Sequence, residues 1–249
     1  AEHKHGDIVV AFVPDEEVGL RGAKALDLSR FAVDFAWTID CCELGEIVYE
    51  NFNAASAEIR FTGVTAHPMS AKGVLVNPLL MATDFMSYFD RQQTPEHTAG
   101  REGYVWFNGI HGDQNSTRLQ ANIRDFDLDS FNRRKQQIGE AAEKIAAQYP
   151  TARVEFTISD TYSNISNDIG EDRRAIDLMF TAMESLGITP KPTPMRGGTD
   201  GAALSAKGLL TPNFFTGAHN FHSKFEFLPL RAFEASYLTA LQLCLLAAD

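Results

Sequence analysis

Three consecutive carboxylates, Asp15, Glu16 and Glu17, follow an apolar stretch at residues 8–13. That stretch predicts a strand buried on both faces of a parallel sheet. Acidic side chains just beyond a buried strand need a compensating charge, which a cation at the strand's carboxyl end supplies. Because adjacent side chains diverge, one carboxylate can bind metal while its neighbour acts as general base toward a metal-bound water. The alternative is a solvated loop or a helix N-terminus, where acidic residues are favoured.

Asp40 and His222 are expected at the same edge of the predicted sheet. Asp40 ends a predicted strand at residues 35–39, and His222 follows another at residues 210–215 and a break at Gly217. Open α/β sheets place their sites at this carboxyl edge, and carboxylates with one imidazole form a common hydrolytic zinc environment. Taken singly, Asp40 reads as a turn residue and His222 as a surface histidine. Together with the acidic triplet they favour a metal site.

Two further segments contain residues suited to substrate contact. Residues 196–201 read RGGTDG, in which glycines allow close backbone approach and Arg196 can fork onto a substrate carboxylate. No Gly-Lys-Ser/Thr follows, so the segment is not a P-loop, and a plain glycine-rich turn is the alternative. His67 precedes Pro68, which holds the histidine in an extended conformation from which its side chain can project.

The periodicity of the middle of the chain differs from that of its two ends. From about residue 51 the order is strand, helix, strand, strand, helix, strand, with Asn77 and Asp129 as expected helix caps. This order is that of a ferredoxin-like domain, an antiparallel sheet with helices on one face. The flanking segments alternate apolar strands and short helices. We therefore predict an α/β domain made of residues 1–50 and 163–249, with an α+β domain inserted at 51–162.

The composition excludes several classes of function. Among 249 residues, 44% are hydrophobic, and the formal charge of −11 offers no basic stripe for a nucleic-acid partner. No apolar run approaches the length that a membrane-spanning helix needs. The three cysteines, Cys41, Cys42 and Cys244, make a poor disulfide framework and lack a CxxC pair, so a reducing cytoplasm is the expected location.

Several motifs taken together resemble the peptidase T family of tripeptide aminopeptidases, within the aminoacylase-type dinuclear zinc metallopeptidases. The resemblance covers nearly the whole chain. Its most specific segments are DEEVG at 15–19, YENFNAAS at 49–56, HP at 67–68 with AKG at 71–73, IRDFD at 123–127, RGGTDG at 196–201, and 212–217 followed by His222.

The resemblance implies an enzyme fold and a set of roles. The α/β part corresponds to a zinc-exopeptidase-like catalytic domain, and the inserted part to a lid through which relatives form a homodimer. Glu16 corresponds to the general base, Glu17 and His222 to ligands of one zinc ion, and Asp40 to a ligand of the other. The implied substrate is a short peptide that loses its N-terminal residue.

Three further residues receive roles from the same resemblance. His67 corresponds to a lid histidine that reaches the partner subunit's active site and steadies the oxyanion there. Arg124 and Arg196 correspond to substrate-binding residues.

The chain also departs from the family pattern. The family's upstream His-x-Asp motif and zinc-bridging Asp have no counterpart, so we expect the catalytic domain to be incomplete, with weak metal binding and little activity. We also expect exposed apolar surface near residues 8–13 and 214–215. Cys41, Cys42 and Glu43 stand where relatives commonly have Gly-Gly-Pro. A cysteine here either adds a soft metal ligand or is a substitution that the loop tolerates. Phe225 stands where relatives often carry a second His. The alternatives are a non-catalytic dimerising remnant and a related dipeptidase or deacylase.

Overall fold

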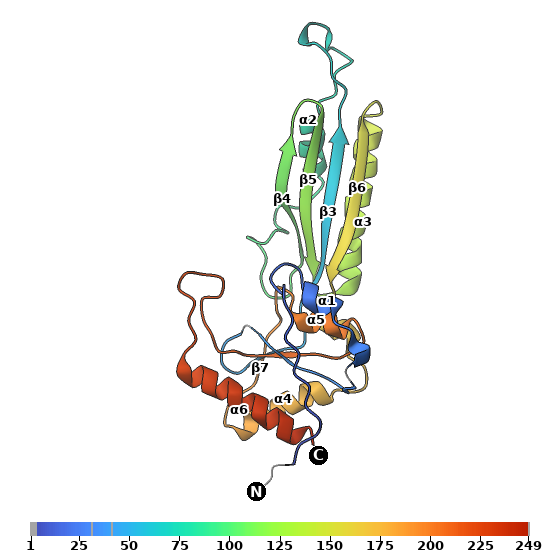
Figure 1. Cartoon of the computed structure of the whole chain (residues 1–249). Coiled ribbons are helices and arrows are strands. Elements are labelled where there is room, and N and C mark those ends of the chain that lie inside the picture. The colour runs from blue at the N-terminus through green and yellow to red at the C-terminus, as the bar shows by residue number, and fades with distance from the viewer. Residues whose placement is uncertain (1–3, 31, 41, 249) are drawn as a thin grey trace. The chain divides into compact units, whose positions relative to one another are not determined.

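A computed structural model describes residues 4–30, 32–40 and 42–248 of the chain (Figure 1). The chain divides into two compact units. The discontinuous unit consists of Ala1–Asn51 and Ser163–Asp249, and the inserted unit of Phe52–Tyr162.

The inserted unit is built on one antiparallel sheet of long strands. Its strands are β3 (Asn53–Thr62), β4 (Tyr104–Gly112), β5 (Ser116–Asp125) and β6 (Arg153–Tyr162), in the order β4-β5-β3-β6. Helices α2 (Pro78–Met86) and α3 (Leu128–Gln148) lie on the same face of this sheet (Figure 1). The central position of β3, the first strand of the unit, confirms the predicted ferredoxin-like arrangement.

The core of the inserted unit follows from the two periodicities in its sequence. Along β3, Ala57, Ile59 and Phe61 are buried while the residues between them are exposed, as alternation in a one-sided sheet requires. Phe85 of α2 and Ile138 of α3 are fully buried and pack into the same cluster. One apolar layer therefore holds the sheet and both helices together.

The two helix starts show one correct and one wrong prediction. Asn77 caps α2 as predicted, because its side chain accepts a hydrogen bond from the backbone N–H of Leu79 at 3.0 Å. The predicted cap of α3, Asp129, is wrong. Asp127 is the cap, and its carboxylate accepts from the backbone N–H of Ser130 at 2.8 Å. Asp129 lies inside the first turn, where an acidic residue also suits the helix dipole.

The discontinuous unit has shorter elements around a small mixed sheet. Strands β1 (Thr38–Ile39), β8 (Asn213–Phe214), β2 (Glu46–Val48) and β7 (Lys191–Pro192) lie in that order. The β1–β8 and β2–β7 pairs are parallel, and the β2–β8 pair is antiparallel. The helices are α1 (Arg21–Ala25), α4 (Arg174–Ser185), α5 (Asp200–Ser205) and α6 (Leu230–Leu246).

The core of this unit joins the sheet to the two longer helices. Ile47, Phe214 and Phe215 pack with Met183 of α4 and Leu243 of α6. Ser236 of α6 donates a hydrogen bond from its hydroxyl to the backbone carbonyl of Phe215 at 2.9 Å. The expectation that residues 214–215 would be exposed is therefore wrong, because β2 and α6 bury both side chains.

The predicted strand at residues 8–13 does not form within the described residues. The segment pairs with no strand there, and its apolar side chains face solvent, with Phe12 94% exposed. The expected exposure of this stretch is thus confirmed, whereas the expected strand is wrong. A strand needs a neighbour for its backbone N–H and C=O groups, and apolar composition alone does not supply one. None of the helices in the described part of the chain has the length and apolar character needed to cross a membrane.

Candidate active site

The acidic triplet lies in a tight turn that leads into α1. The backbone carbonyl of Glu16 accepts from the N–H groups of Gly19 at 3.2 Å and Leu20 at 2.9 Å. Asp15 and Leu20 both have positive φ angles, 62° and 59°, in the left-handed region that L residues seldom adopt. The turn, rather than a strand end, therefore fixes where these carboxylates point.

His222 contacts Glu17, although the two residues are 205 positions apart in the sequence. The Nε2 atom of His222 lies 2.9 Å from the Oε1 atom of Glu17, and both side chains are largely exposed. The backbone N–H of His222 donates to the carboxylate of Glu226 at 2.9 Å. His222 itself has a φ of 61°, so this local bond helps to hold a conformation that a histidine rarely takes.

Glu16 lies in a strongly negative field. Burial, followed by the carboxylates of Asp40, Glu17 and Asp200, raises the pKa of Glu16 from 4.5 to about 7, while His222 partly offsets the shift. These interactions place Asp40 near Glu16, although the two residues are on separate elements. A carboxylate with a pKa near neutrality is the type of group that serves as a general base.

Asp40 is positioned by the end of β1. Its backbone N–H donates to the carbonyl of Phe214 at 3.4 Å, and its carbonyl accepts from the side-chain amide of Asn213 at 2.7 Å. The same amide group accepts from the hydroxyl of Thr38 at 2.6 Å. Asn213 is fully buried and so ties β1 to β8 immediately beside Asp40. The two strands that precede Asp40 and His222 in sequence, β1 and β8, are therefore parallel neighbours, whereas no strand precedes the acidic triplet among the described residues.

Asp200 is a member of the acidic group that the sequence analysis did not select. It is the first residue of α5, and burial, then the charge of Asp40, raises its pKa. Its Oδ1 atom is buried without a hydrogen-bond partner among the described residues. The sequence feature that could have indicated Asp200 is its position in the RGGTDG segment, at the start of a helix. Gly201, in the same segment, packs so closely on the backbone carbonyl of Thr211 that a side chain would clash there.

The other predicted substrate residues are placed as follows. In the inserted unit, the Nδ1 atom of the exposed His67 accepts from the backbone N–H of Met69 at 3.2 Å. Arg124 donates to the carbonyls of Ala55 and Ile123 at 3.0 and 2.9 Å. Arg196, in the discontinuous unit, lines a cavity of about 420 Å³.

The donor chemistry fits a hydrolytic metal site, but the donor number is low. Glu17 and His222 offer a carboxylate and an imidazole side by side. Glu16 interacts electrostatically with both of them and with Asp40. No group of three or more His, Cys, Asp or Glu residues arranged to hold an ion occurs among the described residues. A catalytic zinc ion normally has three protein ligands. Cys41 lies outside the described residues, and Cys42, with a φ of 68°, lines the larger cavity.

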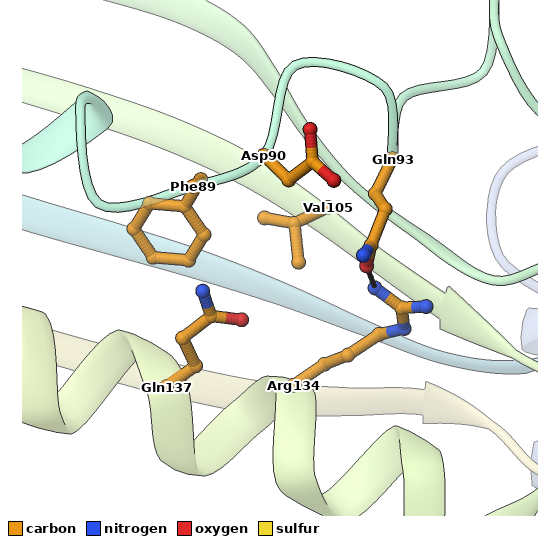
Figure 2. Close-up of a pocket in the computed structure, with 6 residues that line it drawn as sticks. All are labelled: Phe89, Asp90, Gln93, Val105, Arg134 and Gln137. Atoms are coloured by element: carbon orange, nitrogen blue, oxygen red, sulfur yellow. Dashed lines mark hydrogen bonds between the residues drawn. The ribbon is translucent and has the colours of Figure 1, made fainter.

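The second cavity, in the inserted unit, is structural. It measures about 60 Å³, which is room for very little water and none for a peptide. Arg134 lines it and donates to the side chain of Gln93 at 2.6 Å (Figure 2). The same guanidinium donates to Asp125 at 2.8 Å, so these groups already satisfy one another.

Comparison with known proteins gives a consistent set of relatives. Residues 49–152 match the model of the peptidase dimerisation domain. The chain is 66% identical to a peptidase T-like protein of Yersinia pestis over 100% of this chain and 60% of the relative. It is 44% identical to a peptidase T of Caldanaerobacter subterraneus, over 94% of this chain and 57% of the relative.

The fold comparison agrees with the sequence comparison. The crystal structure of the aminopeptidase PepT of Bacillus cereus matches with a TM-score of 0.83 at 20% identity, over 95% of this chain and 63% of that one. The chain therefore spans about three fifths of the length of the relatives that it matches.

Proposed function

This chain is homologous to peptidase T-like proteins along its whole length, and on that premise we propose that it forms part of a metal-dependent site that removes the N-terminal residue from tripeptides. One observation carries the proposal. Glu17 and His222, 205 residues apart, meet at 2.9 Å, and Glu16 lies next to Glu17. Each of these residues belongs to a segment on which the family resemblance depends.

The proposed division of roles follows from the chemistry of the side chains. Glu17 and His222 would hold one zinc ion, and Asp40 would contribute to a second. Bound zinc supplies Lewis acidity toward the peptide carbonyl and toward water. Glu16 accepts the proton that water loses on attack and delivers it to the leaving amine. The negative field around Glu16 suits this role, since acceptance of a proton relieves repulsion from Asp40.

Substrate contact is proposed for three residues outside this group. Arg196, which lines the larger cavity, provides a guanidinium that can donate hydrogen bonds to the bound peptide. Arg124 is a second candidate, although two of its hydrogen bonds go to backbone carbonyls. His67 is proposed to steady the oxyanion in the active site of a partner subunit. This role requires a homodimer formed through the inserted unit, most of which matches the dimerisation domain. The free thiol of Cys244 suits a cytoplasmic location.

A tripeptide hydrolysis assay tests the proposal. The 249-residue chain is assayed with added zinc, alone and with a polypeptide that corresponds to the unmatched part of the Yersinia relative. We expect little turnover by the chain alone, turnover in the mixture, and its loss when the chain carries Glu16→Gln. Rapid hydrolysis by the chain alone would contradict the expected impairment. Hydrolysis that survives Glu16→Gln would contradict the assigned base.

A non-catalytic dimerising remnant is the second candidate, because fewer than three ligands per ion are brought together among the described residues. Equilibrium zinc titration separates the two functions. Zinc binding that is weakened about tenfold or more on substitution of Glu17 or His222 indicates part of a working site, whereas no binding together with stable dimers indicates the remnant.

A further inference from the structure

The larger cavity lies wholly within the discontinuous unit and has a volume of about 420 Å³. Its walls come from β2, from the segment after β7 and from the loop after β8. The wall includes Glu43, Glu46, Met195, Arg196, His219 and Phe221. The volume falls in the range of small-ligand sites and suits part of a short peptide.

The cavity wall continues along the chain into the candidate metal ligands. Cys42 lines the cavity two residues after Asp40, and Asn220 lines it two residues before His222. Because a residue spans at most about 3.6 Å of chain, each of these wall positions lies within about 7 Å of the corresponding ligand backbone. A peptide whose scissile bond is held at Glu17 and His222 can therefore place its adjoining residue in the cavity.

Glu46 gives this cavity a fixed carboxylate. Its Oε2 atom accepts from the backbone N–H of Glu43 at 2.8 Å. Its Oε1 atom lies 3.2 Å from the hydroxyl of Thr193, which is equally distant from the carbonyl of Lys191 and can donate to either. Each carboxylate oxygen can accept two hydrogen bonds, so both retain capacity for a ligand. These two contacts hold the carboxylate in place before any ligand arrives, which lowers the entropy cost of binding.

Glu43 adds a second carboxylate at the rim. Its side chain is 67% exposed, and its Oε1 atom lies 3.8 Å from the Nδ1 atom of His219. The ring of His219 stacks on Phe227 with centroids 5.2 Å apart, which fixes the imidazole beside Glu43. The wall therefore contains two carboxylates and the one guanidinium of Arg196, so the net charge of these three groups is negative. Met195 and Phe221 provide apolar surface beside them.

We infer that this cavity binds the free α-ammonium end of the peptide substrate, with Glu46 as the principal acceptor and Glu43 as a second. The inference rests on the proposed function, because only a peptidase that acts at the N-terminus needs to recognise that amine. The ammonium group donates to Glu46, and the first side chain lies on Met195 and Phe221. Charge-assisted hydrogen bonds of this kind are about twice as strong as neutral ones.

Peptide binding to the 249-residue chain tests this assignment without any hydrolysis. Tri-alanine and N-acetyl-tri-alanine are titrated by nuclear magnetic resonance in the presence of a chelator, so that no metal-dependent turnover occurs. We expect the acetylated peptide to bind about tenfold more weakly, because it lacks the ammonium group. The amide oxygen of Glu46→Gln still accepts one hydrogen bond. This variant is expected to weaken the binding of tri-alanine about tenfold and to leave the binding of the acetylated peptide unchanged.

The remaining variants separate recognition from general damage. Glu43→Gln, at an exposed position, is expected to weaken the binding of tri-alanine by a smaller factor. Glu184→Gln, on the exposed side of α4, is the charge-matched control and is expected to leave the binding of both peptides unchanged. Equal binding of the two peptides, no binding of either, or unchanged tri-alanine affinity in Glu46→Gln would overturn the inference. Failure of hydrolysis in the zinc assay with intact amine selectivity here would instead reject the proposed function alone.

Discussion

The Nε2 atom of His222 lies 2.9 Å from the Oε1 atom of Glu17, although 205 residues separate the two in sequence. The contact joins a turn that precedes α1 to a loop that precedes α6. Both side chains are largely exposed, so the pair contributes little to folding stability by itself. Its significance is chemical, because an imidazole and a carboxylate side by side are donors that zinc accepts.

The first prediction concerns zinc affinity. Because Glu17 and His222 supply two protein donors where a catalytic site normally has three, we expect the chain alone to bind zinc only weakly, with a dissociation constant above about 1 µM. Glu17→Gln and His222→Ala are each expected to weaken this affinity about tenfold or more. Isothermal titration calorimetry at constant pH measures the change.

His97→Ala is the matched control for these titrations, since His97 is an exposed histidine of the inserted unit that bonds only to nearby Thr94 in the described contacts. Its affinity for zinc should equal that of the unmodified chain. Equal loss of zinc binding in His97→Ala and His222→Ala would show that binding is non-specific and would remove His222 from the site.

The second prediction concerns the pH dependence of folding. The pKa of Glu16 rises from 4.5 to about 7 on folding, so the folded chain binds this proton more tightly than the unfolded chain. The charged form is therefore destabilising, and the free energy of unfolding falls as pH rises from 4.5 toward 7. Glu16→Gln removes that effect. The variant should be more stable than the parent by about 1 kcal/mol at pH 8, after allowance for solvent screening of a half-buried group, and equally stable near pH 4.

Urea unfolding at both pH values, with a chelator present, measures this difference. Glu184→Gln removes an exposed carboxylate and should show no change between the two conditions. A Glu16→Gln variant whose stability follows the parent at both pH values would show that Glu16 is not in a negative field.

The inserted unit was predictable from sequence because its signals are local and repeated. The alternation at residues 55–61 of β3, the Asn77–Pro78 start of α2 and the apolar stripe of α3 each specify one element independently of the rest. The discontinuous unit was less predictable. Its strands are two or three residues long, too short for periodicity, and residues 8–13 had the composition of a strand without a partner to pair with among the described residues.

The candidate site shows the same division between local and long-range information. Asp40 and the acidic triplet could be selected because each follows an apolar run. The meeting of Glu17 with His222 depends on packing across 205 residues, which spacing does not reveal. Asp200 was missed because its burial depends on the contact of α5 with the loop before β8, where Gly201 lies against Thr211.

The third prediction concerns self-association of the inserted unit. Strand β4 is an edge of its sheet and exposes Trp106 and Ile110, 43% and 47% exposed, on a unit that matches the dimerisation domain. An exposed edge with large apolar side chains is a surface for pairing with another chain. We expect Trp106→Glu with Ile110→Glu to shift the chain from dimer to monomer in light scattering, with a dissociation constant at least tenfold higher.

Phe156→Glu on β6 is the control for this experiment, because β6 forms the opposite edge and Phe156 is 45% exposed. It should leave the dimer intact. Dissociation caused by Phe156→Glu but not by the two β4 substitutions would place the interface at the other edge. A monomeric parent chain would reject the homodimer for this polypeptide.

The fourth prediction concerns the buried ion pair between Arg134, which lines the small cavity of the inserted unit, and Asp125. Arg134 donates to Asp125 at 2.8 Å, and their side chains are 17% and 8% exposed. Removal of the guanidinium leaves the carboxylate of Asp125 buried without its cation, so we expect Arg134→Ala to destabilise the unit by about 3 kcal/mol.

Arg133→Ala, next to it on α3 and bonded only to Ser130 in the described contacts, should change stability by less than about 0.5 kcal/mol. Trp37 and Trp106 are the two tryptophans of the chain, so unfolding in a Trp37→Phe background reports on the inserted unit through Trp106. Equal stability of the Arg134→Ala and Arg133→Ala variants would show that the pair is not a structural support of the sheet and α3.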